Sequence, residues 1–170
     1  MAPLFPPVVQ HITTNDENGT SFFYNAAAPS TRDRGAGKMT FLYSTPPSFT
    51  MDSNADLSHY LAAASKDPLP SFPAAGSSVV AMLDLAPNTR DGETFMHRTK
   101  TLDYIFMMEG ELELELDGGE KRIVKKGEFI VQRACWHKFR NLTSEPARMA
   151  VVVLGSEGAV EGGIERLEAK

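Results

Sequence analysis

The sequence is poor in cysteine. Its 170 residues include one, Cys135, so no disulfide can form within the chain. A single free thiol is compatible with a reducing compartment. Residues 1–7 contain no positively charged segment followed by an apolar one, which argues against a secretory signal. We therefore predict a cytoplasmic protein.

Long apolar runs and blocks of basic charge are also lacking. No stretch approaches the roughly 20 apolar residues that cross a bilayer as a helix. The 17 Lys and Arg residues are scattered and are outnumbered by 22 Asp and Glu residues, which gives a formal net charge of -5. Nucleic acid binding depends on a concentrated basic face. The sequence thus predicts neither a membrane nor a nucleic acid as a partner.

Internal repeats are absent as well, which excludes a duplicated two-barrel protein. A length of 170 residues suits one domain with a core of its own. Within this single domain (1–170) we distinguish an irregular N-terminal part (1–76), a strongly patterned part (77–155) and a tail rich in Gly and Glu (156–170). We expect the tail to fray or to form a short helix.

Strand signals, in contrast, are abundant. Residues 111–116 alternate strictly between Glu and Leu, the pattern of a strand with one wet and one buried face. Gly118 and Gly119 follow and permit a tight hairpin turn. Further strands are predicted at 8–13, 21–24, 39–43, 79–85, 95–99, 103–108, 123–124, 128–132, 136–141 and 149–154, with one helix at 56–64. Many short, closely spaced strands predict an all-β sandwich or barrel.

Three polar side chains, His97, Asp103 and His137, fall on strand faces that otherwise carry mainly apolar residues. A buried polar group without a partner is costly, so each of the three taken alone is best explained by one internal hydrogen bond. Together, near strand ends that a barrel brings close, they favour a functional site. Their predicted neighbours on the same faces, and hence the candidate substrate-binding residues, are Phe95, Thr99, Ile105, Met107, Phe139 and Asn141.

Other side chains are expected to be structural. Tyr104, Phe106 and Met108 share the opposite face of the strand that contains Asp103, and we expect them in the core rather than at a substrate. Cys135 is expected to be a small buried residue.

Two segments in the second half of the chain resemble the sequence motifs of the cupins. His97 to Gly110 resembles the first motif, written H-x-H-x3-E-x6-G, and Gly127 to Asn141 resembles the second, written G-x5-P-x-G-x2-H-x3-N. The resemblance implies a cupin-type jelly-roll β-barrel, often dimeric, with a pocket that frequently binds a divalent metal.

The chain departs from these motifs at the positions of the ligands. His97 takes the place of the first histidine, whereas Thr99 stands where the second is expected. Asp103 replaces the glutamate at the right spacing from Gly110, and His137 keeps the last histidine. Two interpretations stay open. Either His97, Asp103 and His137 bind one divalent metal (Fe, Zn or Mn), or they act without metal as acids and bases.

The resemblance implies an enzyme that acts on a small organic molecule, and this variant form of the motif is similar to that of tailoring enzymes for polyketide-like or aromatic metabolites. We favour a lyase or isomerase that decarboxylates, dehydrates or cyclises its substrate. His97 and His137 would be acid and base, with Asp103 orienting one of them. The alternatives are a metal-dependent dioxygenase and a non-catalytic binding protein. We also expect a homodimer, because an apolar N-terminal strand at 8–13 could pair across two copies.

Overall fold

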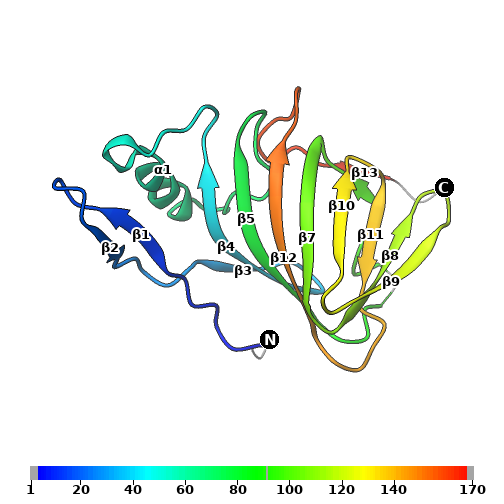
Figure 1. Cartoon of the computed structure of the whole chain (residues 1–170). Coiled ribbons are helices and arrows are strands. Elements are labelled where there is room, and N and C mark those ends of the chain that lie inside the picture. The colour runs from blue at the N-terminus through cyan, green and yellow to red at the C-terminus, as the bar shows by residue number, and fades with distance from the viewer. Residues whose placement is uncertain (1–3, 91, 168–170) are drawn as a thin grey trace.

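The computed structural model describes residues 4–90 and 92–167, and these residues form mainly strands (Figure 1). Within them lie one α-helix, α1 (Ala55–Ala64), and one 3-10 turn, η1 (Asp52–Asn54). The strands are β1 (Ile12–Asn15), β2 (Ser21–Tyr24), β3 (Thr31–Asp33), β4 (Gly37–Thr45), β5 (Ser78–Leu85), β6 (His97–Arg98), β7 (Thr101–Glu109), β8 (Glu111–Leu116), β9 (Lys121–Lys125), β10 (Phe129–Arg133), β11 (His137–Arg140), β12 (Ala147–Gly155) and β13 (Glu165–Arg166). The predicted all-β class is confirmed.

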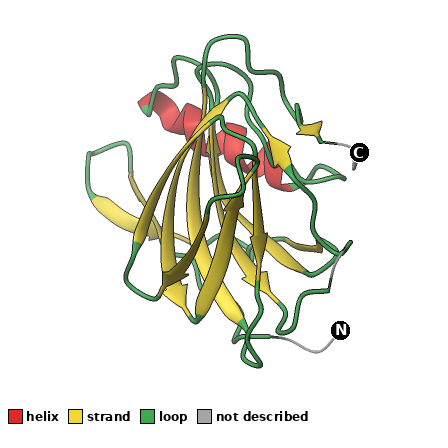
Figure 2. Cartoon of the chain, turned by 90° about the vertical axis from the view of Figure 1, so that its right-hand side faces the viewer, coloured by secondary structure: helices red, strands yellow, loops and turns green. Residues whose placement is uncertain are grey.

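Two antiparallel sheets form the walls of a jelly-roll barrel. The six-stranded sheet has the order β10-β7-β12-β5-β4-β3, and the five-stranded sheet has the order β13-β6-β11-β8-β9. Figure 2 shows these layers of strands with the helix behind them. Strands that follow one another in the chain, such as β7 and β8, belong to different sheets, so the chain crosses repeatedly between the two walls.

Strand alternation decides which side chains enter the space between the sheets. In β12, Met149, Val151 and Val153 are buried while the residues between them are half-buried. In β7 the buried residues are Thr101, Asp103, Ile105 and Met107. The interior is therefore apolar except where a strand places a polar residue in the inward register, and Asp103 is such a residue.

The helix α1 packs against β4 at the side of the barrel (Figure 1). Its buried residues, Leu57, Tyr60 and Ala63, are spaced three apart and so share one helix face. The Tyr60 ring stacks on Tyr43 of β4 with the ring centroids 4.6 Å apart. The predicted helix at 56–64 is confirmed.

The N-terminal strands form a separate hairpin. β1 pairs with β2 in a two-stranded sheet that stands away from the barrel (Figure 1), and Phe23 at its surface is 71% exposed. The strand predicted at 8–13 begins only at Ile12, because residues 8–11 lead into the hairpin without a strand partner.

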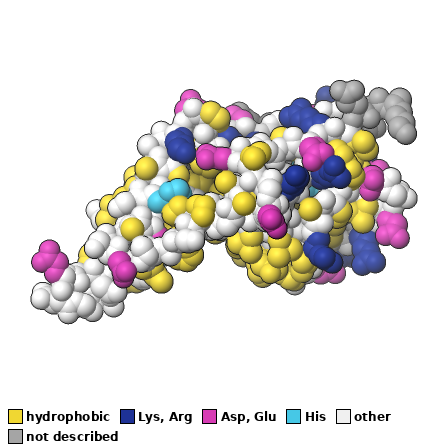
Figure 3. All heavy atoms as spheres, turned by 90° about the horizontal axis from the view of Figure 1, so that it is seen from above, with side chains coloured by type: hydrophobic (Ala, Val, Ile, Leu, Met, Phe, Trp, Pro, Cys, Tyr) yellow, Lys and Arg dark blue, Asp and Glu magenta, His cyan; other side chains and the backbone are white. Residues whose placement is uncertain are grey.

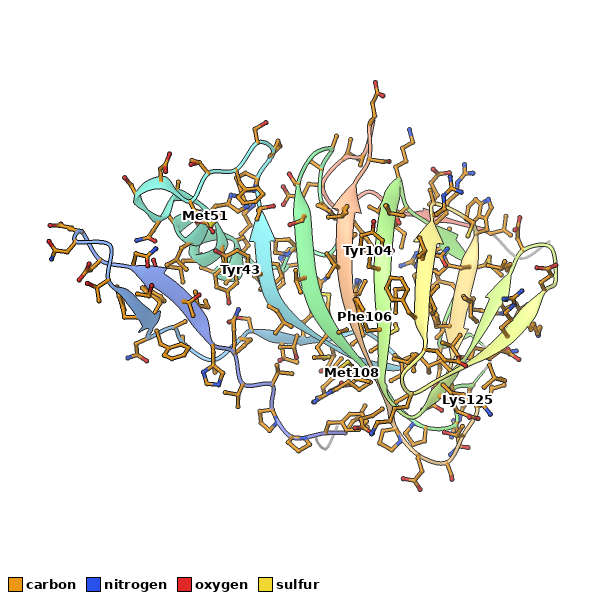
Figure 4. All side chains as sticks on the ribbon, viewed as in Figure 1. Tyr43, Met51, Tyr104, Phe106, Met108 and Lys125 are labelled. Atoms are coloured by element: carbon orange, nitrogen blue, oxygen red, sulfur yellow. The ribbon has the colours of Figure 1, made fainter. Side chains whose placement is uncertain are left out.

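Tyr104, Phe106 and Met108 were expected in the core, and this is wrong. The three side chains lie in a row on the outer face of β7 (Figure 4), where Phe106 and Met108 are exposed. Both faces of β7 carry apolar residues, so the sequence pattern did not tell the inner face from the outer one. Apolar atoms gather along the corresponding edge of the molecule in the view from above (Figure 3).

The C-terminal tail is neither frayed nor helical as far as residue 167. It returns to the barrel, where β13 pairs with β6 and the Leu167 amide donates to the Met96 carbonyl over 2.9 Å. Residues 168–170 of the predicted tail lie outside the described residues. No helix among residues 4–90 and 92–167 is long and apolar enough to cross a membrane.

Candidate functional site

A cavity of about 410 Å³ lies between the two sheets. This volume is within the range of pockets that hold a small organic molecule. The cavity wall contributed by the six-stranded sheet is largely apolar, with Met39, Ala81, Leu83, Ile105, Met149, Val151 and Val153 among its residues. The opposite wall carries His97, His137 and Phe139. The cavity therefore combines an apolar surface with a few polar groups, as ligand sites usually do.

The two histidines of the wall form a cross-strand pair. His97 of β6 lies directly opposite His137 of β11 in the antiparallel register. Residues opposite one another on adjacent strands place their side chains on the same face of the sheet. The ring centroids are 4.3 Å apart, and the ring planes are inclined by 48°. The two imidazoles thus face the same part of the cavity.

Backbone carbonyl groups fix the orientation of both rings. Nδ1 of His97 lies 3.1 Å from the carbonyl oxygen of Phe95, and Nδ1 of His137 lies 2.9 Å from that of Cys135. A carbonyl only accepts, so each Nδ1 carries the proton and donates it, and each neutral ring keeps an unprotonated Nε2. No described residue forms a hydrogen bond with either Nε2 atom. Both histidines line the cavity, so these two lone pairs are available to a ligand.

Burial keeps both rings neutral. Desolvation, followed by the charge that His97 acquires when it is protonated, lowers the pKa of His137 to about 4. Desolvation also lowers the pKa of His97, as do the charges of Arg34 and Arg166 to a smaller extent, and these effects outweigh the opposing effect of the Phe95 carbonyl. At neutral pH the two histidines are therefore proton acceptors rather than cations.

Asp103 reaches the same cavity from the six-stranded sheet. It is 6% exposed, and its Oδ1 atom has no hydrogen-bond partner. Burial raises the pKa of this carboxyl group to about 6, against the effect of a hydrogen bond with the Thr101 side chain. A carboxyl group that titrates near 6 can hold or release a proton under physiological conditions.

Asp103 was expected to orient one histidine, and the structure does not show this. No hydrogen bond between Asp103 and either imidazole is present in the described part of the chain, and the carbonyls of Phe95 and Cys135 take the orienting role instead. Cys135 itself is exposed rather than buried, with its carbonyl facing the imidazole.

The divalent metal that the sequence resemblance implies would need His97, Asp103 and His137 close together as its ligands. Among residues 4–90 and 92–167, no three His, Cys, Asp or Glu side chains are grouped closely enough to hold a metal ion. Asp103 stands on the sheet opposite the histidines, and a site with three protein ligands needs all three within bonding distance of one point. His97, Asp103 and His137 thus do not fit a three-ligand metal site in this arrangement.

The predicted substrate-binding residues divide into two groups. Phe95, Ile105 and Phe139 line the cavity. Thr99, Met107 and Asn141 do not line it. Met107 is part of the apolar core, and the Thr99 hydroxyl lies 2.6 Å from the hydroxyl of Thr101.

Asn141 has a structural role that the motif alone did not reveal. It is 0% exposed, and its side-chain amide donates to the Glu145 carbonyl over 2.8 Å. Its Oδ1 accepts from both the amide and the hydroxyl of Thr143. These bonds fold the loop between β11 and β12.

Sequence reasoning missed three cationic residues that line the cavity, Arg34, Lys38 and Arg166. Arg34 lies in the turn before β4, and Arg166 lies on β13, in the tail that was expected to be irregular. Both line the cavity and both are exposed to solvent, so they mark the place where it opens. No motif or periodicity surrounds either arginine, so the sequence held no signal for them.

Comparison with known proteins agrees with this architecture. A family model described as "Cupin domain" matches residues 81–153. "Oryzines biosynthesis cluster protein J" of Aspergillus oryzae is 37% identical over 95% of this chain and 90% of its own length. "Phomopsin biosynthesis cluster protein C'" of Diaporthe leptostromiformis is 34% identical over 92% and 85%, respectively.

Two further similarities bear on chemistry and on fold. "Cupin-domain-containing oxidoreductase srdD" of Neurospora crassa is 32% identical over 98% of this chain and 85% of its own length. Among solved structures, the polyketide cyclase RemF from Streptomyces resistomycificus superposes with a TM-score of 0.52 at 17% identity, covering 84% of this chain and 82% of that one. At this identity the second similarity establishes the fold alone.

Proposed function

The chain belongs to the cupin superfamily, and from this premise we propose that it is a small-molecule tailoring enzyme of the lyase or isomerase type. It acts by proton transfer on an apolar, polyketide-like or aromatic metabolite. The relatives named after biosynthesis clusters support the metabolic setting. The cavity, with its apolar wall, supports the substrate class.

The observation that carries this proposal is the pair of neutral imidazoles. Both Nδ1 atoms are occupied by backbone carbonyls, and both Nε2 lone pairs remain available within one cavity. A general base must be unprotonated at the working pH and within hydrogen-bond reach of the proton it removes. The lowered pKa values of His97 and His137 supply the first condition.

Asp103 supplies the proton that such a reaction must return. In a dehydration, a histidine takes the proton from carbon while the acid protonates the departing hydroxyl group, so that a C–O bond breaks and water leaves. In a cyclisation, the proton removed from one atom is returned to another and the formula is unchanged. A carboxyl group with a pKa of about 6 is suited to either role, because it can give its proton near neutral pH.

A second candidate reaction is oxidative, since several relatives carry the name oxidoreductase. The alternative from the sequence is an iron-dependent dioxygenase that uses His97, Asp103 and His137 as ligands. That site requires the carboxylate to stand beside both imidazoles, and the described residues show no such group of three. The arrangement therefore favours proton transfer.

The mass of the product separates these reactions. We expect extracts of cells that lack the gene to contain an accumulating compound that the purified protein consumes. Lyase or isomerase chemistry gives a product lighter by water or carbon dioxide, or one of unchanged mass. A product that has gained oxygen or lost two hydrogens overturns the proposal. His97→Ala should lose most of the turnover, whereas His59→Ala, at a half-buried position of α1 that does not line the cavity, should keep it.

A metal assay completes the experiment. The protein is assayed as purified, after chelation, and after adding back Fe, Zn or Mn. Turnover that chelation leaves unchanged supports direct acid–base catalysis. Turnover lost on chelation and restored by one metal contradicts it and indicates that Asp103 moves to join the histidines.

A further inference from the structure

The geometry points to a carboxylate-binding site formed by Arg34 and Arg166 at the opening of the cavity, so that the substrate is an aromatic or otherwise apolar carboxylic acid. This inference rests on the proposed function only in taking the bound acid to be the substrate. The cavity walls receive the apolar part of the molecule, and the two guanidinium groups hold its anionic end.

Arg166 is placed beside the histidines by strand pairing. In the five-stranded sheet His97 lies opposite Arg166 of β13 on one side and opposite His137 of β11 on the other. These three residues form one cross-strand row, and neighbours in such a row have Cβ atoms about 5 Å apart. A carboxylate held by Arg166 therefore brings atoms within a few bonds of itself to the two Nε2 lone pairs.

Both arginines lie over aromatic rings, and no described residue accepts a hydrogen bond from either guanidinium group. The guanidinium carbon of Arg166 lies 3.9 Å from the centroid of the Phe95 ring, and that of Arg34 lies 5.9 Å from the centroid of Phe72. Stacking fixes the plane of a guanidinium without using its edge, and the edge presents paired donors that match a carboxylate.

Neither arginine is paired with an acidic group of the described chain. Three carboxyl groups also line the cavity. Asp103 lies on β7 of the six-stranded sheet and has no hydrogen bond to either arginine in the described structure, and the other two are engaged elsewhere. Asp84 accepts two bonds from Arg148, at 2.6 and 2.7 Å, and Glu93 accepts from the backbone amide of Arg90 at 2.8 Å. Two cations that stand close together without a counter-ion repel each other, and a bound anion relieves this repulsion.

The charges of the two arginines lower the pKa values of neighbouring groups in the cavity. Arg166 contributes to lowering the pKa of Arg34, after desolvation and the charge of Arg32, and both Arg34 and Arg166 contribute to lowering that of His97. The anionic end of the substrate and the reacting atoms thus occupy neighbouring parts of one cavity.

Calorimetric titration of the full chain with 2-naphthoate and with 2-naphthamide tests this site. The two probes share a ring system and differ in charge. We expect the acid to bind about tenfold more tightly than the amide, since charge-assisted hydrogen bonds supply that difference. Arg166→Gln and Arg34→Gln should each reduce the preference, and the control Arg122→Gln, on exposed β9, should keep it.

Equal affinity for acid and amide, or no binding of the acid at millimolar concentration, overturns the inference. A preference for the acid over the amide that persists in both Arg166→Gln and Arg34→Gln also overturns the inference. His97→Ala separates this result from the proposed function, because it should abolish turnover and leave the preference for the acid intact. If turnover depends on His97 but no preference for the acid is found, the proposed proton-transfer function is supported and the carboxylate-binding site is ruled out.

Discussion

His97 and His137 occupy directly opposed positions of β6 and β11, and their ring centroids are 4.3 Å apart. The charge that His97 acquires on protonation lowers the pKa of His137. Each ring therefore opposes protonation of its neighbour, and the pair titrates as a unit.

We expect His97→Gln to raise the pKa of His137 above its value of about 4, because the variant removes a neighbouring charge while desolvation remains. The NMR titration of ring carbon and nitrogen shifts measures this value directly. His59→Gln, at a half-buried position of α1 outside the cavity, is the matched control and should leave the titration of His137 unchanged. A pKa of His137 that does not respond to His97→Gln would mean that the rings do not interact.

The stability of the protein should depend on pH through the two histidines and Asp103, whose effects have opposite signs. The native pKa of His137 lies below the ordinary value of 6.5, so its contribution is lost as the pH falls from about 6.5 to about 4. The native pKa of Asp103 is raised from 3.8 to about 6, so its contribution has the opposite sign and stability is gained as the pH falls through the same range. Each of these two effects amounts to about 3 kcal/mol, so they largely offset each other. The lowered pKa of His97 acts in the same direction as that of His137 and leaves a net loss of stability as the pH falls.

The substitution Asp103→Asn removes the contribution of the carboxyl group to the pH dependence of stability and leaves that of the histidines. At pH 8 the variant should be more stable than the native protein by up to about 3 kcal/mol, because it no longer buries a charged carboxylate. Towards pH 4 its stability should fall, since the histidine effect is then unopposed. Urea unfolding at several pH values measures both. A variant less stable than the native protein at pH 8 would contradict the buried, raised-pKa carboxyl group.

Asn141→Ala should lower the free energy of unfolding without changing the affinity of the folded protein for a ligand. The substitution removes side-chain hydrogen bonds to Thr143 and Glu145 from a fully buried position, at a cost of about 3 kcal/mol. Thr143→Val, which removes a half-buried hydroxyl group of the same loop, should cost less. If the affinity for 2-naphthoate fell tenfold in folded Asn141→Ala protein, Asn141 would be a binding residue after all.

The outer face of the six-stranded sheet is expected to join two copies of the chain. Phe106 and Met108 of β7 and Phe129 and Val131 of β10 lie exposed on it side by side, with the rings of Phe106 and Phe129 4.8 Å apart. Such a surface is matched by the identical surface of a second copy in a two-fold dimer. Sedimentation velocity should show a dimer that Phe129→Lys dissociates.

The control for this experiment is Ile123→Lys, which places the same charge on an exposed apolar residue of the five-stranded sheet. It should leave the dimer intact. A native protein that sediments as a monomer at micromolar concentration would rule out the interface.

The sequence held enough information for the barrel and for its polar lining, because strand periodicity depends on neighbours close in the chain. Strict alternation at 111–116 predicted β8, and the inward register of His97 and His137 followed from the same rule. What periodicity does not specify is the inner face of a strand that is apolar on both sides. For this reason Phe106 and Met108 were assigned to the core although they lie on the surface.

Strand periodicity does not predict contacts between segments that lie far apart in the sequence. Arg166 reaches the site because two residues of the tail pair with β6, which lies almost seventy positions earlier, and no local signal marks so short a strand. The backbone carbonyls that orient the histidines also cannot be predicted from the sequence, since every residue has a carbonyl group. Whether Asp103 stands beside the histidines depends on how the two sheets are spaced, which no local pattern specifies.

The division of the cavity between two sheets has a consequence for how such proteins diversify. The histidine pair stands on the five-stranded sheet, whereas the apolar wall belongs to the six-stranded sheet. After gene duplication, one copy can exchange wall residues such as Leu83, Met149 or Val151 and accept a differently shaped molecule, while the strands that hold the histidines stay unaltered. Selection can thus tune the choice of metabolite and the proton-transfer apparatus as separate traits of one small barrel.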